Sequence, residues 1–120
     1  MPKGYLVDPT ERTITQVDVV RPADLIGCST ITASAFNDAG DVVYVDDEGL
    51  LKGPTDFFLI EGYPQPLAGK GVVVGTDDEG DDVEPSVSLE WLQENIDCGC
   101  IVKMGNVIMF MGERHRKPIE

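Results

Sequence analysis

The sequence Val42-Val43-Tyr44-Val45-Asp46 carries the strongest strand signal in this chain, because β-branched and aromatic residues follow one another over a full strand length. A second run, Gly71-Val72-Val73-Val74-Gly75, is short and apolar, which is typical of a buried strand. A chain of 120 residues is the size of one domain. These runs therefore predict a single domain built on a sheet.

Further strands are expected before the first of these runs. Residues 4–8 and 13–19 flank an Asp-Pro turn and predict a β-hairpin, and residues 30–36 alternate polar and apolar side chains as a half-buried strand does. Between them, Pro22 suits the first position of a short helix that Gly27 ends.

Residues 57–60 are apolar and predict either a buried strand or a single helical turn. The segment 63–66 holds two prolines, which remove backbone donors and exclude regular structure there. Residues 76–85 are polar, charged and glycine-containing, and predict a solvated loop.

The C-terminal part predicts one clear helix and a hairpin. The helix is expected over about residues 86–96, capped by Ser86 or Ser88 and ended by Gly99. Its apolar stripe consists of Leu89, Leu92 and Ile96, with Trp91 alongside. Residues 100–111 flank Gly105-Asn106, which suits a type II′ turn.

Together these elements predict an α+β fold: a mainly antiparallel sheet of short strands, one clear helix at about 86–96 and a C-terminal hairpin at about 100–111. We expect the domain to span residues 1–112 and to be followed by a basic flexible tail over residues 113–120.

The chain is strongly acidic, with 22 Asp and Glu against nine Lys and Arg and a net charge of −13. The charge is concentrated in residues 37–97, which contain 16 acidic residues and only two basic ones, Lys52 and Lys70. Such a charge repels nucleic acid and anionic membrane surfaces and attracts basic proteins. No run approaches the ~18 apolar residues of a membrane span, and the N-terminus lacks a secretory signal, so a cytoplasmic location is expected.

The acids gather in two places, which we call the acidic turn (residues 46–48) and the acidic loop (residues 77–84). These are the candidate partner-binding residues: Asp46, Asp47 and Glu48 in the turn, and Asp77, Asp78, Glu79, Asp81, Asp82 and Glu84 in the loop. If the loop were extended, its charges would be spaced roughly like the phosphates of a nucleic acid strand, ~3.4 Å apart. A nucleic-acid mimic is therefore one interpretation, and an ordinary solvated loop is the other.

No catalytic residues and no cofactor are predicted. The only histidine, His115, lies in the basic tail, so a nucleophile has no evident base, and neither phosphate-binding nor dinucleotide-binding loops occur. The acidic stretches lack the spacing of a calcium loop. The cysteines are Cys28, Cys98 and Cys100, an odd number that argues against a disulfide framework. We expect them to be small buried hydrophobic residues; whether Cys98 and Cys100 bind a metal stays open.

Three segments, 24–28 (Asp-Leu-Ile-Gly-Cys), 43–52 with its acidic turn, and 66–77 with its glycine–valine strand, resemble in order and spacing a family of small uncharacterised proteins encoded by bacteriophages and other mobile elements. The resemblance covers about residues 4–84. It departs from the family's pattern after Lys52, where Thr55-Asp56-Phe57-Phe58 replaces a segment that contains asparagine. Residues 86–111 are expected to be an addition to the family's pattern. The resemblance implies a genomic context rather than a mechanism.

Three functions follow as hypotheses. The first is a non-enzymatic, phage-encoded accessory protein that binds a basic surface of a bacterial host protein, as a nucleic-acid mimic or anti-defence factor. The second is a small-ligand-binding protein or enzyme with a pocket beside Tyr44, Phe57 and Tyr63. The third is a structural or homo-oligomeric component in which the hairpin 100–111 supplies an edge strand.

Overall fold

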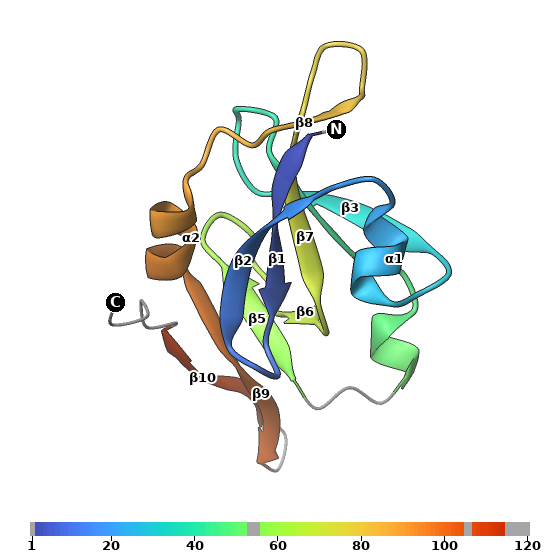
Figure 1. Ribbon diagram of the computed structural model, residues 1–120. Coiled ribbons are helices and arrows are strands. Elements are labelled where there is room, and N and C mark those ends of the chain that lie inside the picture. Colours follow the sequence, from blue (N-terminus) through green and yellow to red (C-terminus); the bar gives the residue numbers. More distant parts are fainter. Residues whose placement is uncertain (1, 53–55, 105–106, 115–120) are drawn as a thin grey trace.

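The computed structural model describes residues 2–52, 56–104 and 107–114 and shows two antiparallel sheets with two α-helices (Figure 1). The first sheet has the strand order β2-β1-β7-β4-β3, and β8 pairs with β7 beside this path. Its strands are β1 (Lys3–Asp8), β2 (Thr13–Asp18), β3 (Ile31–Ala35), β4 (Val42–Asp46), β7 (Gly71–Thr76) and β8 (Asp82–Val83).

The second sheet has the order β10-β9-β5-β6. Its strands are β5 (Phe57–Ile60), β6 (Leu67–Ala68), β9 (Ile96–Met104) and β10 (Val107–Arg114). A short 3₁₀ helix, η1 (Gly49–Lys52), follows β4. The α+β class with mainly antiparallel sheets is thus confirmed, and residues 57–60 form a strand rather than a helical turn.

Strand β7 is the centre of the first sheet, with β1 on one side and β4 on the other. Its residues Gly71 to Gly75 are all buried, because side chains on both faces of the sheet are covered. Val73 joins the larger core cluster, whereas Val72 and Val74 join the smaller one on the opposite face. Burial on both faces explains the unbroken run of valines.

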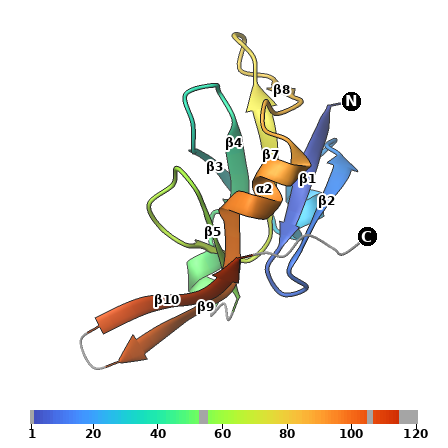
Figure 2. The same ribbon diagram turned by 90° about the vertical axis from the view of Figure 1, so that its left-hand side faces the viewer.

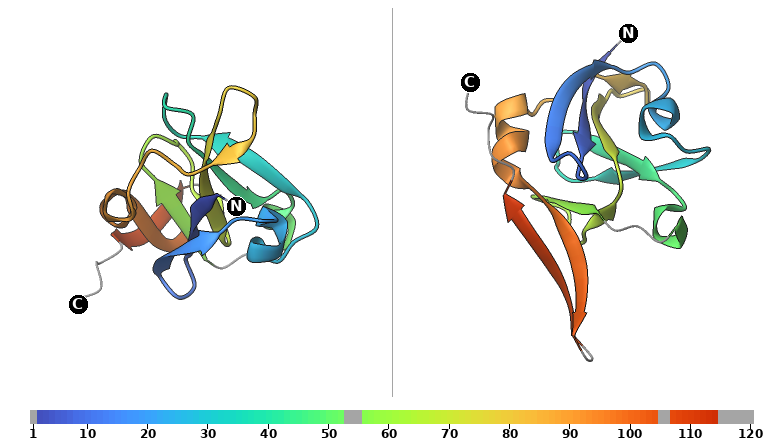
Figure 3. Two further views of the ribbon diagram at one scale, coloured as in Figure 1. Left: turned by 45° about the horizontal axis from the view of Figure 1, so that its top comes forward. Right: turned by 60° about the horizontal axis from the view of Figure 1, so that its bottom comes forward.

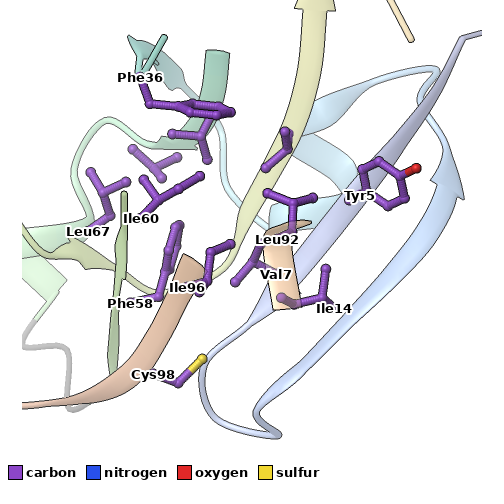
Figure 4. Close-up of a cluster of buried hydrophobic side chains, with 13 residues drawn as sticks. Tyr5, Val7, Ile14, Phe36, Phe58, Ile60, Leu67, Leu92, Ile96 and Cys98 are labelled. Atoms are coloured by element: carbon purple, nitrogen blue, oxygen red, sulfur yellow. The ribbon is translucent and has the colours of Figure 1, made fainter. Parts of the chain in front are cut away.

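The two faces are covered by different elements. Helix α1 (Pro22–Ile26) places Leu25 and Ile26 against Val72 and Val74 on one face. On the other face lie β5, β9 and helix α2 (Leu89–Asn95) (Figure 2), and they contribute the large side chains of the main core (Figure 4). The largest fully buried side chains there are Phe58, Ile60, Leu92 and Ile96.

Helix α2 is shorter than the predicted 86–96. Ser88 is its N-cap and accepts a 3.0 Å hydrogen bond from the N–H of Trp91, while Ser86 is bonded elsewhere. At the other end, Ile96 is extended and starts β9, where it pairs with Ile60. The prediction that Gly99 ends the helix is therefore wrong. Gly99 lies within β9, opposite Phe57 of β5. Helix α1 ends at Gly27, with φ of 83°, as expected.

The predicted C-terminal hairpin is confirmed and is longer than expected. Strand β9 begins at Ile96, and β10 continues to Arg114, which pairs with Asp97. The hairpin points away from the rest of the molecule (Figure 3). The turn predicted at Gly105-Asn106 lies outside the described residues, as do residues 115–120 of the expected tail. The boundary at residue 112 stays a prediction.

Candidate functional site

The acidic turn and the acidic loop lie at opposite ends of the first sheet. In the antiparallel pair of β4 and β7, Val42 faces Val74 and Val45 faces Gly71. The acidic turn follows the end of β4, and the acidic loop follows the end of β7, so one five-residue strand, about 15 Å long, separates them (Figure 1). The structure does not bring the two groups of candidate residues together.

Within the acidic turn, Asp46 is already neutralised by its own neighbours. Its side chain is only 12% exposed and accepts a 2.6 Å hydrogen bond from the Lys52 ammonium group. It also accepts the N–H of Glu48 at 2.9 Å. The bond to Lys52 is the main reason why the pKa of Asp46 is lowered, and it raises the pKa of Lys52 in return. Only Asp47 and Glu48 expose their side chains at this turn.

The acidic loop is a folded turn, not an extended chain. The carboxylate of Asp77 accepts the N–H groups of Glu79 and Asp81, each at 2.9 Å. Asp77 and Asp81 also share a 3.0 Å backbone hydrogen bond, and Gly80 takes a left-handed conformation with φ of 84°. The loop is therefore not extended, and the predicted similarity between the spacing of its charges and that of phosphates along a nucleic acid strand is wrong. The charges cluster around a turn.

The C-terminal part of the acidic loop is hydrogen-bonded to the first sheet. Strand β8 pairs with Gly75 and Thr76 of β7, and the hydroxyl of Tyr44 donates a 2.6 Å hydrogen bond to Asp82. Burial and then this carboxylate raise the pKa of Tyr44 to about 12. Asp82 is half-buried, whereas the other acids of the loop are exposed: Asp77, Asp78, Glu79, Asp81 and Glu84.

A buried carboxylate, Asp41, joins the turn before β4 to the segment that leads into α2. Asp41 is 1% exposed and accepts hydrogen bonds from Asn37, at 2.9 Å, and from the N–H and hydroxyl of Ser86, at 2.9 and 2.5 Å. Burial raises its pKa, but these hydrogen bonds outweigh burial, and the pKa is lowered. The segment 37–41, Asn-Asp-Ala-Gly-Asp, has the residues of an ordinary turn, and nothing in it marks Asp41 as buried.

Two cavities lie on the side of the acidic turn. The larger, about 340 Å³, opens between the β3–β4 edge of the first sheet and the segment 63–68 of the second. Its lining includes Thr32, Ser34, Val45, Asp47, Tyr63 and Leu67. The smaller, about 150 Å³, is lined by Lys52 and Lys70 among others, and Asp46 and Ala68 line both.

The pocket predicted beside three aromatic residues is not formed as expected. Tyr63 lines the larger cavity, but Tyr44 packs on the opposite face of the sheet. Phe57 is buried between Ala68 and Gly99 of its neighbouring strands. Sequence reasoning missed Thr32 and Ser34, because the cavity arises where the edges of two sheets meet, and no local pattern reports that meeting.

The cysteines differ in their surroundings. Cys98 is buried, and burial raises the pKa of its thiol to about 11. Cys28 is half-buried and donates to the carbonyl of Thr30 at 3.3 Å, and burial raises its pKa as well; Cys100 is exposed. Among residues 2–52, 56–104 and 107–114, no three His, Cys, Asp or Glu side chains are grouped to hold a metal ion. In the same residues, no helix has the length and apolar character needed to cross a membrane.

Two bacterial proteins are similar to this chain. Uncharacterized protein y4iR of Sinorhizobium fredii (strain NBRC 101917 / NGR234) is 33% identical over 93 residues, which cover 72% of this chain and 57% of that protein. Protein PsiB of Rhizobium leguminosarum bv. phaseoli is 32% identical over 74 residues, which cover 62% of this chain and 54% of that protein. The chain thus spans little more than half the length of either relative. No solved structure matches it.

The sequence model of one protein family matches residues 2–102. This region is longer than the resemblance expected over residues 4–84, and it includes α2 and most of β9. The expectation that residues 86–111 are an addition to the family's pattern is therefore wrong for residues 86–102. Because the match covers most of the chain, the protein belongs to the family described as Domain of unknown function (DUF3846).

Proposed function

We propose that this protein is a non-enzymatic binding protein that captures a basic surface of another bacterial protein through its acidic loop. The observation that carries the proposal is the fixed turn on which five exposed acids stand: Asp77, Asp78, Glu79, Asp81 and Glu84. Charges held in place before binding lose less conformational freedom in the complex. They also accelerate the encounter with a basic partner.

The folded turn narrows the hypothesis of nucleic-acid mimicry. An acidic cluster around one turn fits a compact basic patch on a protein. It fits less well into a long basic groove that binds the phosphate backbone of a nucleic acid. The acidic turn lies at the other end of the sheet, and Asp46 is paired with Lys52, so the proposed interface uses the acidic loop alone.

The proposed setting is the cytoplasm of a bacterium, with the gene carried by a phage or another mobile element and the partner supplied by the host. The similar proteins of Sinorhizobium fredii and Rhizobium leguminosarum support a bacterial setting, and a net charge of −13 favours a basic partner.

The experiment compares two variants that remove the same charge. In the loop variant, Asp78→Asn, Glu79→Gln and Asp81→Asn neutralise exposed acids but keep Asp77 and Asp82, which hold the turn. In the control variant, Glu11→Gln, Glu48→Gln and Glu61→Gln remove as many exposed acids elsewhere. Each protein is immobilised, incubated with bacterial lysate at low and high salt, and its bound proteins are identified by mass spectrometry.

We expect a basic protein that the wild type and the control variant retain at low salt, and that the loop variant loses. Because the attraction is electrostatic, high salt should release it from the wild type. Equal retention by the loop variant and the wild type would refute the proposal. Equal loss from both variants would also refute it, since net charge rather than the loop would then decide binding.

A further inference from the structure

We infer that the open edge of β3 and the larger cavity beside it form a docking site for an extended peptide segment that carries a lysine or arginine side chain. Strand β3 is the last strand of its sheet, and within the described residues it pairs with β4 alone. An unpaired strand edge presents N–H and C=O groups that another strand can bind.

The hydrogen bonds at both ends of the β3–β4 pair show which groups face outward. Phe36 donates its N–H to the carbonyl of Asp41, and Asp47 donates its N–H to the carbonyl of Thr30. In an antiparallel pair, bonded residues alternate with residues that direct both groups away from the partner. The residues of β3 that direct theirs to the open edge are therefore Ile31, Ala33 and Ala35.

This edge lacks the features by which proteins usually block strand addition. The sequence of β3, Ile-Thr-Ala-Ser-Ala, has no charged residue and no proline, and its outward residues Ala33 and Ala35 are small and exposed. The opposite edge of the sheet differs, because β2 ends in Asp18, which is paired with Lys3. Small side chains leave room for another backbone to approach β3.

The cavity lies where an added strand would place its side chains. Thr32 and Ser34 line it, together with Val45, which faces Thr32 across the β3–β4 pair. Alternate side chains of a strand paired with β3 would extend over this same face. A volume of about 340 Å³ accommodates a long side chain, whose methylene groups would contact Val45 and Leu67.

The charges around the cavity select a basic occupant. Asp46 is bonded to Lys52, but Asp47 at the cavity lining is exposed and is placed to receive an ammonium or guanidinium group. A second copy of this chain would bring another net charge of −13 and be repelled, whereas a basic segment of another protein would be attracted. The occupant is therefore a segment of a different protein. The site shares no residue with the acidic loop.

The test uses the whole protein to select from a randomised display library of peptides about nine residues long, the length of a long strand. The affinity of the selected peptides is then measured by fluorescence polarisation. Ala33→Pro removes an outward N–H at a position where proline is tolerated in an edge strand. Its matched control, Gln16→Pro, removes an outward N–H from β2 at the opposite edge of the sheet.

We expect the selected peptides to carry Lys or Arg, to bind about tenfold more weakly to Ala33→Pro, and to bind equally well to Gln16→Pro. Asp47→Asn keeps the shape of the side chain, and should weaken binding of these peptides about fivefold but not binding of the same peptides with norleucine in place of the basic residue. Circular dichroism confirms that each variant is folded.

The inference would be overturned by the absence of any enriched peptide, by enriched peptides without a basic residue, or by equal affinity for Ala33→Pro and the wild type. A concentration-dependent dimer that Ala33→Pro abolishes, seen by sedimentation velocity, would also overturn it, because the occupant would then be a second copy. The loop variant described above should bind the peptides as the wild type does. This inference and the proposed function can therefore fail separately.

Discussion

The hydroxyl of Tyr44 donates a 2.6 Å hydrogen bond to the carboxylate of Asp82, and so joins strand β4 to the strand that closes the acidic loop. The two residues are 38 positions apart in the chain. One acid of the loop thus belongs to the framework of the fold, while its neighbours face the solvent. The conformation of the loop depends on a side chain of the sheet, not only on its own turn residues.

The substitution Tyr44→Phe should make local opening of the acidic loop more frequent. The change removes a hydrogen bond to a carboxylate and leaves the ring in place, so we expect the free energy of unfolding to fall by about 1–2 kcal/mol. Hydrogen exchange of residues 77–83 should accelerate more than that of β1. Tyr63→Phe, on the other side of the sheet, is the matched control. Unchanged exchange in the loop of Tyr44→Phe would show that the turn alone fixes it.

The hydrogen bonds of Asp41 should make stability depend on pH in the acid range. Because its pKa is lowered in the folded state, the carboxylate contributes stability above its ordinary value of 3.8, and this contribution is lost as the pH falls through the folded value. Asp41→Asn should cost about 2–4 kcal/mol at neutral pH, since it leaves buried donors without their acceptor.

The measurement is urea unfolding of Asp41→Asn and wild type over a pH series. The difference between them should begin to shrink as the pH falls below 3.8, the ordinary pKa of the carboxyl in the unfolded chain, and should be lost as the pH falls through the lowered pKa of the folded state. Asp38→Asn, an exposed acid of the same turn, serves as the control and should be nearly neutral. A pH-independent difference for Asp41→Asn would mean that packing, not the charge, accounts for the loss.

Ser88 should contribute measurably to helix α2. Ser88→Ala removes the side-chain acceptor for the N–H of Trp91 and should lower the free energy of unfolding by about 1 kcal/mol. Ser88→Gly should cost only a few tenths of that, because glycine is tolerated at this position. Thermal unfolding of the three proteins gives the comparison, and equal losses for Ala and Gly would argue against a capping role.

Gly71 allows strand β7 of the first sheet to lie close to the side chain of Phe58 in strand β5 of the second sheet. A Cβ atom at this position would lie 2.6 Å from the ring of Phe58 and 3.0 Å from Val43. Gly71→Ala should therefore destabilise the protein by about 1–3 kcal/mol through overpacking. Adding Phe58→Leu to Gly71→Ala should cost less than Phe58→Leu costs in the wild type, because the smaller side chain relieves the clash. Strictly additive losses in denaturant unfolding would contradict this contact.

The strands could be predicted because their signals are local. The alternation in β3, the valine run of β7 and the β-branched run of β4 depend on neighbouring residues, and the structure has all three strands. The helix was predicted too long because its ends are decided by distant contacts. Ser86 bonds to Asp41, 45 residues earlier, and Ile96 pairs with Ile60 of β5. Tertiary pairing thus overrode a favourable helical pattern.

The candidate site was predicted less well than the fold, for a related reason. Composition identified the acidic residues, but only strand register shows that Asp46 and Asp77 stand at opposite ends of β4 and β7. The pairing of Asp46 with Lys52, six positions away across η1, was also hidden from the pattern of charges. The larger cavity was not predicted because it forms between the edges of two sheets, and the sequence of neither edge alone indicates a cavity.

The position of β7 in the chain has a consequence for how the protein is made. The hairpin of β1 with β2 and the pair of β3 with β4 are synthesised first, yet among the described strands it is β7 that pairs with both and joins them into one sheet. Until residue 76 has left the ribosome, the first sheet lacks its central strand, and the apolar residues of β1 and β4 have no strand β7 to pack beside. We therefore expect the first sheet to be completed late, when the valine-rich strand β7 pairs with β1 on one side and with β4 on the other.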